Sequence, residues 1–162
     1  MSDKHFSDFM AIIKYLFLLE LGGIIYYSIE VLWRGYSHWT MFILGGVCLC
    51  IIGSLNTYFS WDMYMELQII TGDIITLTLE LITGCIVNIG LGWHVWDYSD
   101  MPGNIAGQIC PQFAILWLPI VTAAILLDDY IRYKVFYEEK PHYNWFIKEL
   151  INKIKEKNHG NG

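Results

Sequence analysis

Charged residues are scarce in this sequence. Asp, Glu, Lys and Arg make up only 16% of its 162 residues, against roughly 25% in an ordinary soluble domain. Apolar residues make up 55%. They are concentrated in long runs and do not alternate with polar residues at the spacing of an amphipathic helix or strand. So few charges cannot cover the surface of a soluble domain of this size. We therefore expect an integral membrane protein.

Motifs of catalysis and cofactor binding are also missing. The chain has no HExxH, no Gly-x-Ser-x-Gly and no Walker loop, so we predict no catalytic residue, no cofactor and no metal site. Its four cysteines form no CxxC pair and lie in or beside apolar runs, where we interpret them as small buried hydrophobic residues. No basic face of the kind that nucleic acid requires is present. The sequence favours neither an enzyme nor a nucleic-acid partner.

What is present is a set of four apolar runs, at about 9–33, 39–59, 67–91 and 109–127. Each is long enough to cross a hydrocarbon core of about 30 Å at the helical rise. The first eight residues are polar and no small-residue cleavage site follows, so we expect the first run to be retained as a helix. The predicted fold class is all-α: an integral membrane bundle of four transmembrane helices over 1–135, followed by a basic tail over 136–162.

The positive charges predict the orientation. Seven Lys and Arg residues follow the fourth run, whereas the second and third loops contain none. The positive-inside rule then places the C-terminus, and with four spans also the N-terminus, in the cytoplasm. Arg34, in the first loop, opposes this orientation. We expect the protein in a bacterial plasma membrane.

The basic tail contains a predicted amphipathic helix over about 143–157. Apolar residues recur there at helical spacing: Phe146, Ile147, Leu150, Ile151 and Ile154. Two interpretations remain open. Such a helix can lie on the anionic inner leaflet, or it can pack against the bundle or against a partner protein.

Acidic residues inside the apolar runs are the main candidates for a ligand or ion site. A carboxylate deep in a bilayer costs several kcal/mol unless it is neutralised or paired. In the third run, Asp73 and Glu80 share one helix face, and in the first run Glu30 shares a face with Glu20 and Tyr27. These stripes are predicted to meet inside the bundle. The alternative is that the acids are neutral or paired, as Glu30 can be with Arg34, and only fix helix packing.

Three further positions suggest structural roles. Gly46 and Gly53 lie on one narrow stripe of the second run, where another helix can approach closely. Pro119 removes a backbone hydrogen bond from the fourth helix and predicts a kink.

One loop is distinctive enough to carry a family resemblance. Trp96-Asp97-Tyr98-Ser99 is followed by Asn104-x-x-Gly107 and by Trp117, and it is preceded by Glu80 with Thr83-Gly84. This arrangement, with Glu30 and Arg34-Gly35, resembles the CmpB-like family of small membrane proteins, named as candidate ABC-transporter permeases. The resemblance covers about residues 26–133, with a departure at 42–46. It implies a transport permease, and because the chain has no ATPase domain, an ABC role would require a separate partner.

The same loop is expected to be ordered. Trp96 and Tyr98 can anchor it at the membrane interface, and Gly107 permits a left-handed turn. Either Asp97 and Asn104 line an entrance near Glu80, or the loop is a structured turn that starts the fourth helix. Our leading hypothesis is a small permease or permease-like subunit with Glu30, Glu80 and Asp97 lining a polar interior. The alternative is a non-transporting membrane scaffold that docks a partner protein through its C-terminal helix; a homo-oligomer is also open.

Overall fold

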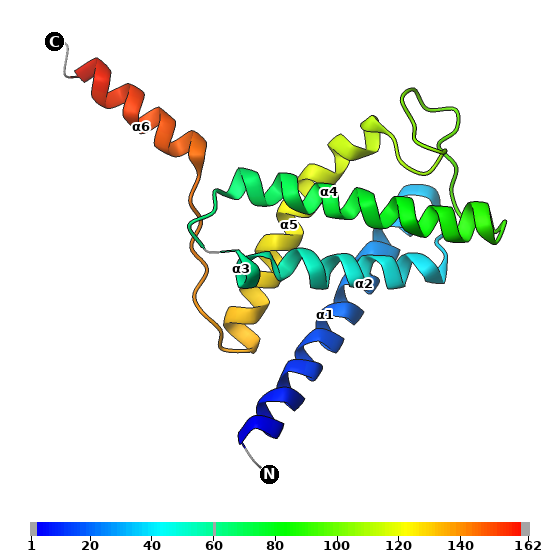
Figure 1. The fold of residues 1–162 in the computed structure, drawn as a ribbon, viewed down its shortest axis with the longest axis horizontal. Helices are drawn as coiled ribbons and strands as arrows, with labels where there is room; N and C mark the ends of the chain where they lie inside the picture. Colours follow the sequence, from blue (N-terminus) through cyan, green and yellow to red (C-terminus); the bar gives the residue numbers. More distant parts are fainter. Residues whose placement is uncertain (1–2, 60, 160–162) are drawn as a thin grey trace.

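The computed structural model describes residues 3–59 and 61–159, and within these residues it contains helices and no strand. The elements are α1 (Asp3–Arg34), α2 (Trp39–Gly53), α3 (Leu55–Tyr58), α4 (Met65–Gly84), the π-helical turn η1 (Cys85–Gly90), α5 (Pro111–Val135) and α6 (Phe146–His159). The predicted all-α fold is confirmed. Figure 1 shows α2 and α4 side by side, with α1 and α5 running obliquely across them.

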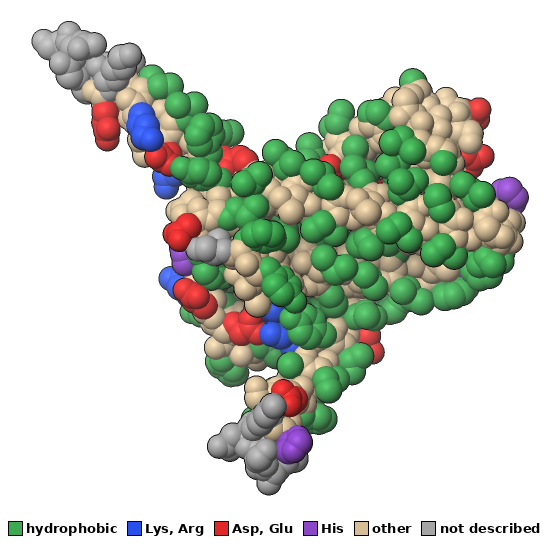
Figure 2. All heavy atoms as spheres, in the orientation of Figure 1, with side chains coloured by type: hydrophobic (Ala, Val, Ile, Leu, Met, Phe, Trp, Pro, Cys, Tyr) green, Lys and Arg blue, Asp and Glu red, His purple; other side chains and the backbone are tan. Residues whose placement is uncertain are grey.

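Four helical stretches are long and apolar enough to cross a membrane: His5–Arg34, Trp39–Tyr58, Met65–Gly90 and Pro111–Val135. Much of the molecular surface is correspondingly hydrophobic, with side chains that would face lipid tails (Figure 2). The predicted bundle of four spans with a further helix at the C-terminus is present.

Small residues let α1 and α2 pack closely. A Cβ atom added to Gly22 would lie 2.6 Å from the Cβ of Leu49, and one added to Gly23 would lie 2.6 Å from the carbonyl oxygen of Phe42. Gly46 faces the backbone of Leu19 in the same contact. The absence of side chains at these positions brings the two backbones together, which is how helices associate where lipid replaces the hydrophobic effect.

Two buried clusters form the interior of the bundle. One lies toward the loop that joins η1 to α5 and consists of Tyr26, Met41, Leu44, Val87, Val95 and Trp96. The other lies toward the opposite end and consists of Ile52, Leu55, Met65, Val121 and Ile125. Both draw residues from several elements, so the interior depends on all four spans.

The fourth helix extends beyond its predicted end. The apolar run predicted an end near residue 127, where Asp128 and Asp129 follow, but α5 continues to Val135 and buries both acids. Arg132, one turn further on, pairs with Asp128 inside the bundle. The prediction of the helix end was wrong because an acid with a buried partner does not stop a helix.

The second span contains a break that its uninterrupted apolar run did not predict. α2 ends at Gly53, and Ser54 donates its hydroxyl to the carbonyl oxygen of Cys50 at 2.7 Å before α3 begins.

In α1, the predicted polar stripe is split between two environments. Glu20 and Tyr27 are exposed on the outside of the bundle, whereas Glu30 lies half-buried. Glu20, Tyr27 and Glu30 do share one face of α1, as the helical spacing predicted. The centre of that face, however, does not point at α4.

Candidate functional site

Glu80 is one of three acidic residues that are buried among the described residues, together with Asp128 and Asp129. It lies on α4, and only 3% of it is exposed. Its Oε2 accepts a hydrogen bond from the indole N–H of Trp117 on α5 at 3.0 Å, and its Oε1 accepts one from the hydroxyl of Tyr26 on α1 at 3.4 Å. Within the part of the chain that the structure describes, no ion pair includes Glu80. The carboxyl group is thus held by two neutral donors from two neighbouring spans.

The two donors also hold each other. The rings of Tyr26 and Trp117 are stacked, with centroids 5.4 Å apart and an angle of 20° between their planes. Offset stacking of this kind stabilises aromatic pairs beyond their buried area. The stack therefore restricts the rotamers of both donors, and it presents their polar atoms to Glu80 already oriented.

A cavity of about 300 Å³ adjoins Glu80. It lies among α1, α2, α4 and α5, and its walls are predominantly aliphatic and aromatic. Its few polar side chains are Tyr26, Cys48, Thr76 and Glu80. Apolar walls with a small number of placed polar groups are typical of sites for small molecules.

Pro119 lies in the wall of this cavity. It falls within α5, where it cannot donate a backbone hydrogen bond to the carbonyl group of Ile115. This missing bond lies on the helix that carries Trp117.

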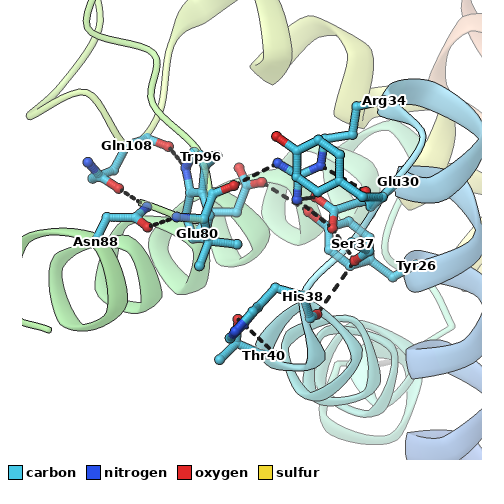
Figure 3. Close-up of polar contacts among 12 residues, drawn as sticks. Tyr26, Glu30, Arg34, Ser37, His38, Thr40, Glu80, Asn88, Trp96 and Gln108 are labelled. Atoms are coloured by element: carbon cyan, nitrogen blue, oxygen red, sulfur yellow. Dashed lines mark hydrogen bonds and ion pairs between the residues drawn. The ribbon is translucent and has the colours of Figure 1, made fainter. Parts of the chain in front are cut away.

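Glu30 takes part in a different set of contacts at the end of α1. Its carboxylate pairs with Arg34 at 2.9 Å, one helical turn away, and accepts a hydrogen bond from Ser37 at 2.5 Å (Figure 3). Arg34 also donates to the carbonyl oxygen of Val95 at 2.8 Å. Glu30 is therefore neutralised by a neighbouring cation and ties α1 to the loop, and it is not among the residues that line the cavity.

The loop between η1 and α5 is fastened to the bundle by buried amide side chains. Asn88, on η1, accepts from the backbone N–H of Val95 at 2.7 Å and donates to Oε1 of Gln108 at 2.7 Å (Figure 3). Trp96 donates its indole N–H to the carbonyl oxygen of Gln108 at 2.9 Å. The sequence carried no signal for Asn88 and Gln108, because an isolated amide side chain, in a helix or in a loop, belongs to no motif.

Asp97 and Asn104 stabilise the loop from within. The carboxylate of Asp97 accepts from the hydroxyl and the backbone N–H of Ser99, at 2.6 and 2.8 Å, and these bonds hold the pKa of Asp97 below its usual range. The side chain of Asn104 bonds the carbonyl oxygens of Ser99 and Met101 and the backbone N–H of Gly107. Neither side chain lines the cavity beside Glu80.

The turn also requires Gly107 and Tyr98. Gly107 has φ +69°, and a Cβ there would crowd the hydroxyl of Ser99. Tyr98 donates its backbone N–H to the carbonyl oxygen of Gly107 at 2.7 Å and stacks on Phe113 with ring centroids 4.5 Å apart. Burial raises the pKa of the Tyr98 phenol. The loop is a packed cover over one end of the bundle.

Asp73, the other acidic candidate on α4, has fewer defined contacts than Glu80. It lies on α4 two turns before Glu80 and is half-buried. Its Oδ1 atom is buried, and among the described residues it has no hydrogen-bond partner. The structure does not bring it into the cavity beside Glu80.

A second polar cluster at the opposite end of the bundle was not predicted. Asp128 pairs with Arg132, which also donates to the hydroxyl of Ser54 at 3.2 Å. Asp129 accepts from Asn56 at 2.8 Å and from Tyr143 at 2.9 Å. Gly53 makes room for the carboxyl group of Asp128. The Asp-x-x-x-Arg spacing of residues 128–132 was the available signal, since it places opposite charges on one helix face.

Lys14 and Glu138 extend this cluster to α1. Lys14 on α1 pairs with Glu138 at 2.5 Å, and Glu138 lies 3.7 Å from Arg132. A smaller cavity of about 160 Å³ is lined by Glu138 and Arg132 together with Asn56 and Asp129. Among the described residues, no group of three or more His, Cys, Asp or Glu side chains is placed to hold a metal ion.

These features define a small membrane protein with four spans, a buried carboxyl group at Glu80 beside an apolar cavity, a second buried polar cluster around Asp128 and Asp129, and an ordered loop over one end. Residues 15–152 match the model of the family described as "putative ABC-transporter type IV". The chain belongs to this family, so the resemblance inferred from the Trp-Asp-Tyr-Ser loop is confirmed. No curated protein and no solved structure matches the chain.

Proposed function

We propose that this protein is a permease-like membrane protein that takes an amphiphilic, positively charged molecule into the cavity beside Glu80. The family match and the four apolar helices support a membrane protein of a transporter-type family. The proposal adds a site, a substrate class and a role for one carboxyl group.

The burial of Glu80 beside an apolar cavity carries this proposal. An acid in this setting is costly unless something compensates it. Tyr26 and Trp117 supply one hydrogen bond to each oxygen. A carboxylate has about four lone-pair positions, so two remain for a ligand, and a cationic head group would supply the missing charge.

The shape of the cavity favours an amphiphile over a bare ion. A volume of about 300 Å³ is large for an ion, and it falls at the lower end of the range typical of small-molecule sites. Aliphatic walls do not replace the hydration shell of a metal cation, but they do accept a hydrocarbon chain. The ligand would therefore place its head group at Glu80 and its chain along the walls formed by α2 and α5.

The setting of the site in the membrane completes the proposal. We place both termini in the cytoplasm, supported by the Lys and Arg residues that follow α5. An ABC-type role would require a separate ATPase, which is a further part of the proposal. The alternative, a scaffold that docks a partner protein, is supported by the projection of α6 away from the bundle (Figure 1).

The test uses two probes of equal chain length and opposite charge. The protein is reconstituted in liposomes, and uptake is measured for decyltrimethylammonium, whose fixed charge slows passive crossing, and for decyl sulfate. We expect protein-dependent uptake of the cation only. Native mass spectrometry from nanodiscs then measures retention of each probe by the protein.

Two variants with the same change in charge locate the site. Glu80→Gln should abolish retention and uptake of decyltrimethylammonium. Glu20→Gln also removes an acid from a membrane span, but Glu20 is exposed on the outside of α1, so this variant should behave as the native protein. Equal uptake by the native protein and Glu80→Gln would refute the proposal, as would a matching loss in both variants.

A further inference from the structure

The C-terminal helix is attached to the bundle at its first turn. The carboxylate of Glu66, on the first turn of α4, accepts from the backbone N–H groups of Phe146 and Ile147 at 3.1 and 3.2 Å. Tyr64 donates its hydroxyl to Glu149 at 2.8 Å and packs its ring against Phe146. Beyond this turn α6 projects away from the four spans (Figure 1).

The apolar face of α6 is left uncovered. Its five large hydrophobic residues are each between 45% and 57% exposed: Phe146, Ile147, Leu150, Ile151 and Ile154. At 100° per residue these five side chains share one side of the helix. Figure 2 shows hydrophobic side chains along one edge of α6 and charged ones along the other. A face of this kind indicates an interaction surface.

The charges around this face show what kind of surface it fits. By the same geometry, Lys153 borders the apolar side on one edge, and Lys148 and Lys155 border it on the other. Glu156 lies well round on the polar face, and Glu149 accepts from Tyr64 and pairs with Lys153 at 2.7 Å. Lysines at the border can extend their ammonium groups to lipid phosphates while their carbon stems cover apolar surface. Glu156 is then turned toward water, away from an anionic surface, and the negative charge of Glu149 is offset by Lys153.

The attachment point places α6 at the right depth. α4 begins a membrane span at Met65, so the first turn of α6 is held at the level where that span meets the lipid head groups. Aromatic rings gather at the same level: Trp61 stacks on His142, and Trp145 lies half-exposed at the start of α6. Tryptophan and tyrosine favour this interfacial layer.

We propose that α6 is a lipid-binding helix that lies on the membrane surface, with its apolar face in the boundary between acyl chains and head groups and its bordering lysines on anionic phosphates. The occupant of the exposed face is therefore the bilayer itself. This function is independent of Glu80 and of the proposed transport.

The experiment measures amide hydrogen exchange in α6 of the full chain. The protein is placed in nanodiscs of phosphatidylcholine alone, and in nanodiscs of two parts phosphatidylcholine to one part phosphatidylserine. We expect slower exchange across residues 146–156 in the anionic discs, with unchanged exchange in α1 to α5. Attraction to an anionic surface contributes about 1 kcal/mol for each lysine, which corresponds to roughly fivefold for each lysine.

Matched variants separate the lipid surface from other occupants. Lys148→Gln and Asn152→Asp each lower the net charge by one unit, but Lys148 lies closer to the apolar face than Asn152 does. We expect Lys148→Gln to speed exchange roughly fivefold in anionic discs, and Asn152→Asp to have a smaller effect. Leu150→Gln with Ile154→Gln should remove protection in both types of disc.

Three results would overturn the assignment. The first is exchange in α6 that is insensitive both to phosphatidylserine and to the Leu150→Gln, Ile154→Gln pair. The second is protection that rises with protein concentration together with a cross-linked dimer, which would identify a second copy as the occupant. The third is protection that develops only after a soluble protein fraction is added, which would identify a protein partner. Because the four spans are not altered, none of these results depends on refolding of a damaged bundle.

Discussion

Gly53 on α2 lies directly against the carboxyl group of Asp128 on α5. A methyl group at Gly53 would overlap that carboxyl group. Asp128 is fully buried and pairs with Arg132, which in turn reaches Ser54 beside the glycine. One glycine thus allows an ion pair to lie inside the membrane bundle, where it joins α2 to α5.

Gly53→Ala should therefore destabilise the bundle. The added methyl group must displace Asp128 from Arg132 or separate the two helices, and overpacking of this kind costs about 1–3 kcal/mol. The measurement is the free energy of unfolding in mixed detergent micelles. Gly90→Ala is the matched control, because an added Cβ there meets only the carbonyl oxygen of Cys85, at 3.4 Å. Equal stability of the two variants would show that the Gly53 contact is not tight.

Asp128→Asn should have a larger effect than the same change on the surface. It leaves Arg132 buried with only the more distant Glu138 as an anionic partner, and an unpaired buried charge costs about 3–5 kcal/mol. Asp100→Asn, in the exposed loop, makes the same chemical change and should leave the midpoint of thermal unfolding where it is. In the Asp128→Asn background, Arg132→Gln should cost less than in the native chain. Additive effects would argue against a coupled pair.

The two hydrogen bonds to Glu80 should differ in strength. Trp117→Phe keeps an aromatic ring against Tyr26 but removes the N–H that donates at 3.0 Å. Loss of a hydrogen bond to a carboxylate costs about 1.5–3 kcal/mol. Tyr26→Phe removes the longer bond of 3.4 Å and should cost less. Trp33→Phe, at a ring that is exposed on α1, serves as the control, and an equal loss in all three variants would contradict this ranking.

Asn88→Ala should loosen the loop without unfolding the spans. The change leaves the backbone N–H of Val95 and the side-chain oxygen of Gln108 without their partner. Each unsatisfied buried group costs about 1–3 kcal/mol, so the amide of Val95 should exchange about tenfold faster or more. Gln112→Ala removes only an exposed bond of 3.4 Å and should leave exchange at Val95 as it was. Hydrogen exchange of residues 91–110 measures both.

Asp97 should titrate below the ordinary range of an aspartate. The hydroxyl of Ser99 and then its backbone N–H stabilise the charged form, so the pKa in the folded loop is lower than in the unfolded chain. The stabilisation is fully present above the unfolded value and is lost as the pH falls through the lower, folded value. A carbon-detected NMR titration of the Asp97 carboxyl group measures this directly. Ser99→Ala should raise the pKa toward its ordinary value, and an unchanged titration would show that these bonds do not form.

Some features of this protein could be predicted because they depend on local sequence. The four spans follow from runs of apolar residues, and the pairing of Glu30 with Arg34 follows from their spacing on one helix. The loop was recognised because Gly107 and its polar neighbours act on residues close to them in sequence. Asp97 and Asn104 lie in an ordered turn, as one of the two interpretations of the loop predicted. The local sequence could not show whether they lie near Glu80. In the structure, other residues line the cavity beside Glu80.

The sequence by itself determined that the chain is an all-helical membrane protein, because too few charges are present to cover a soluble surface. It also marked Glu80 as unusual, because an acid in an apolar run is costly wherever the helix goes. Only the tertiary structure decided which acids are buried together with donors and which face outward. Glu20 and Glu80 look alike in sequence, yet Glu20 lies outside the bundle and Glu80 meets Tyr26 and Trp117 from other helices. The rotation of each helix about its axis is set by close packing at glycines and by contacts distant in sequence, and hydrophobic runs do not encode it.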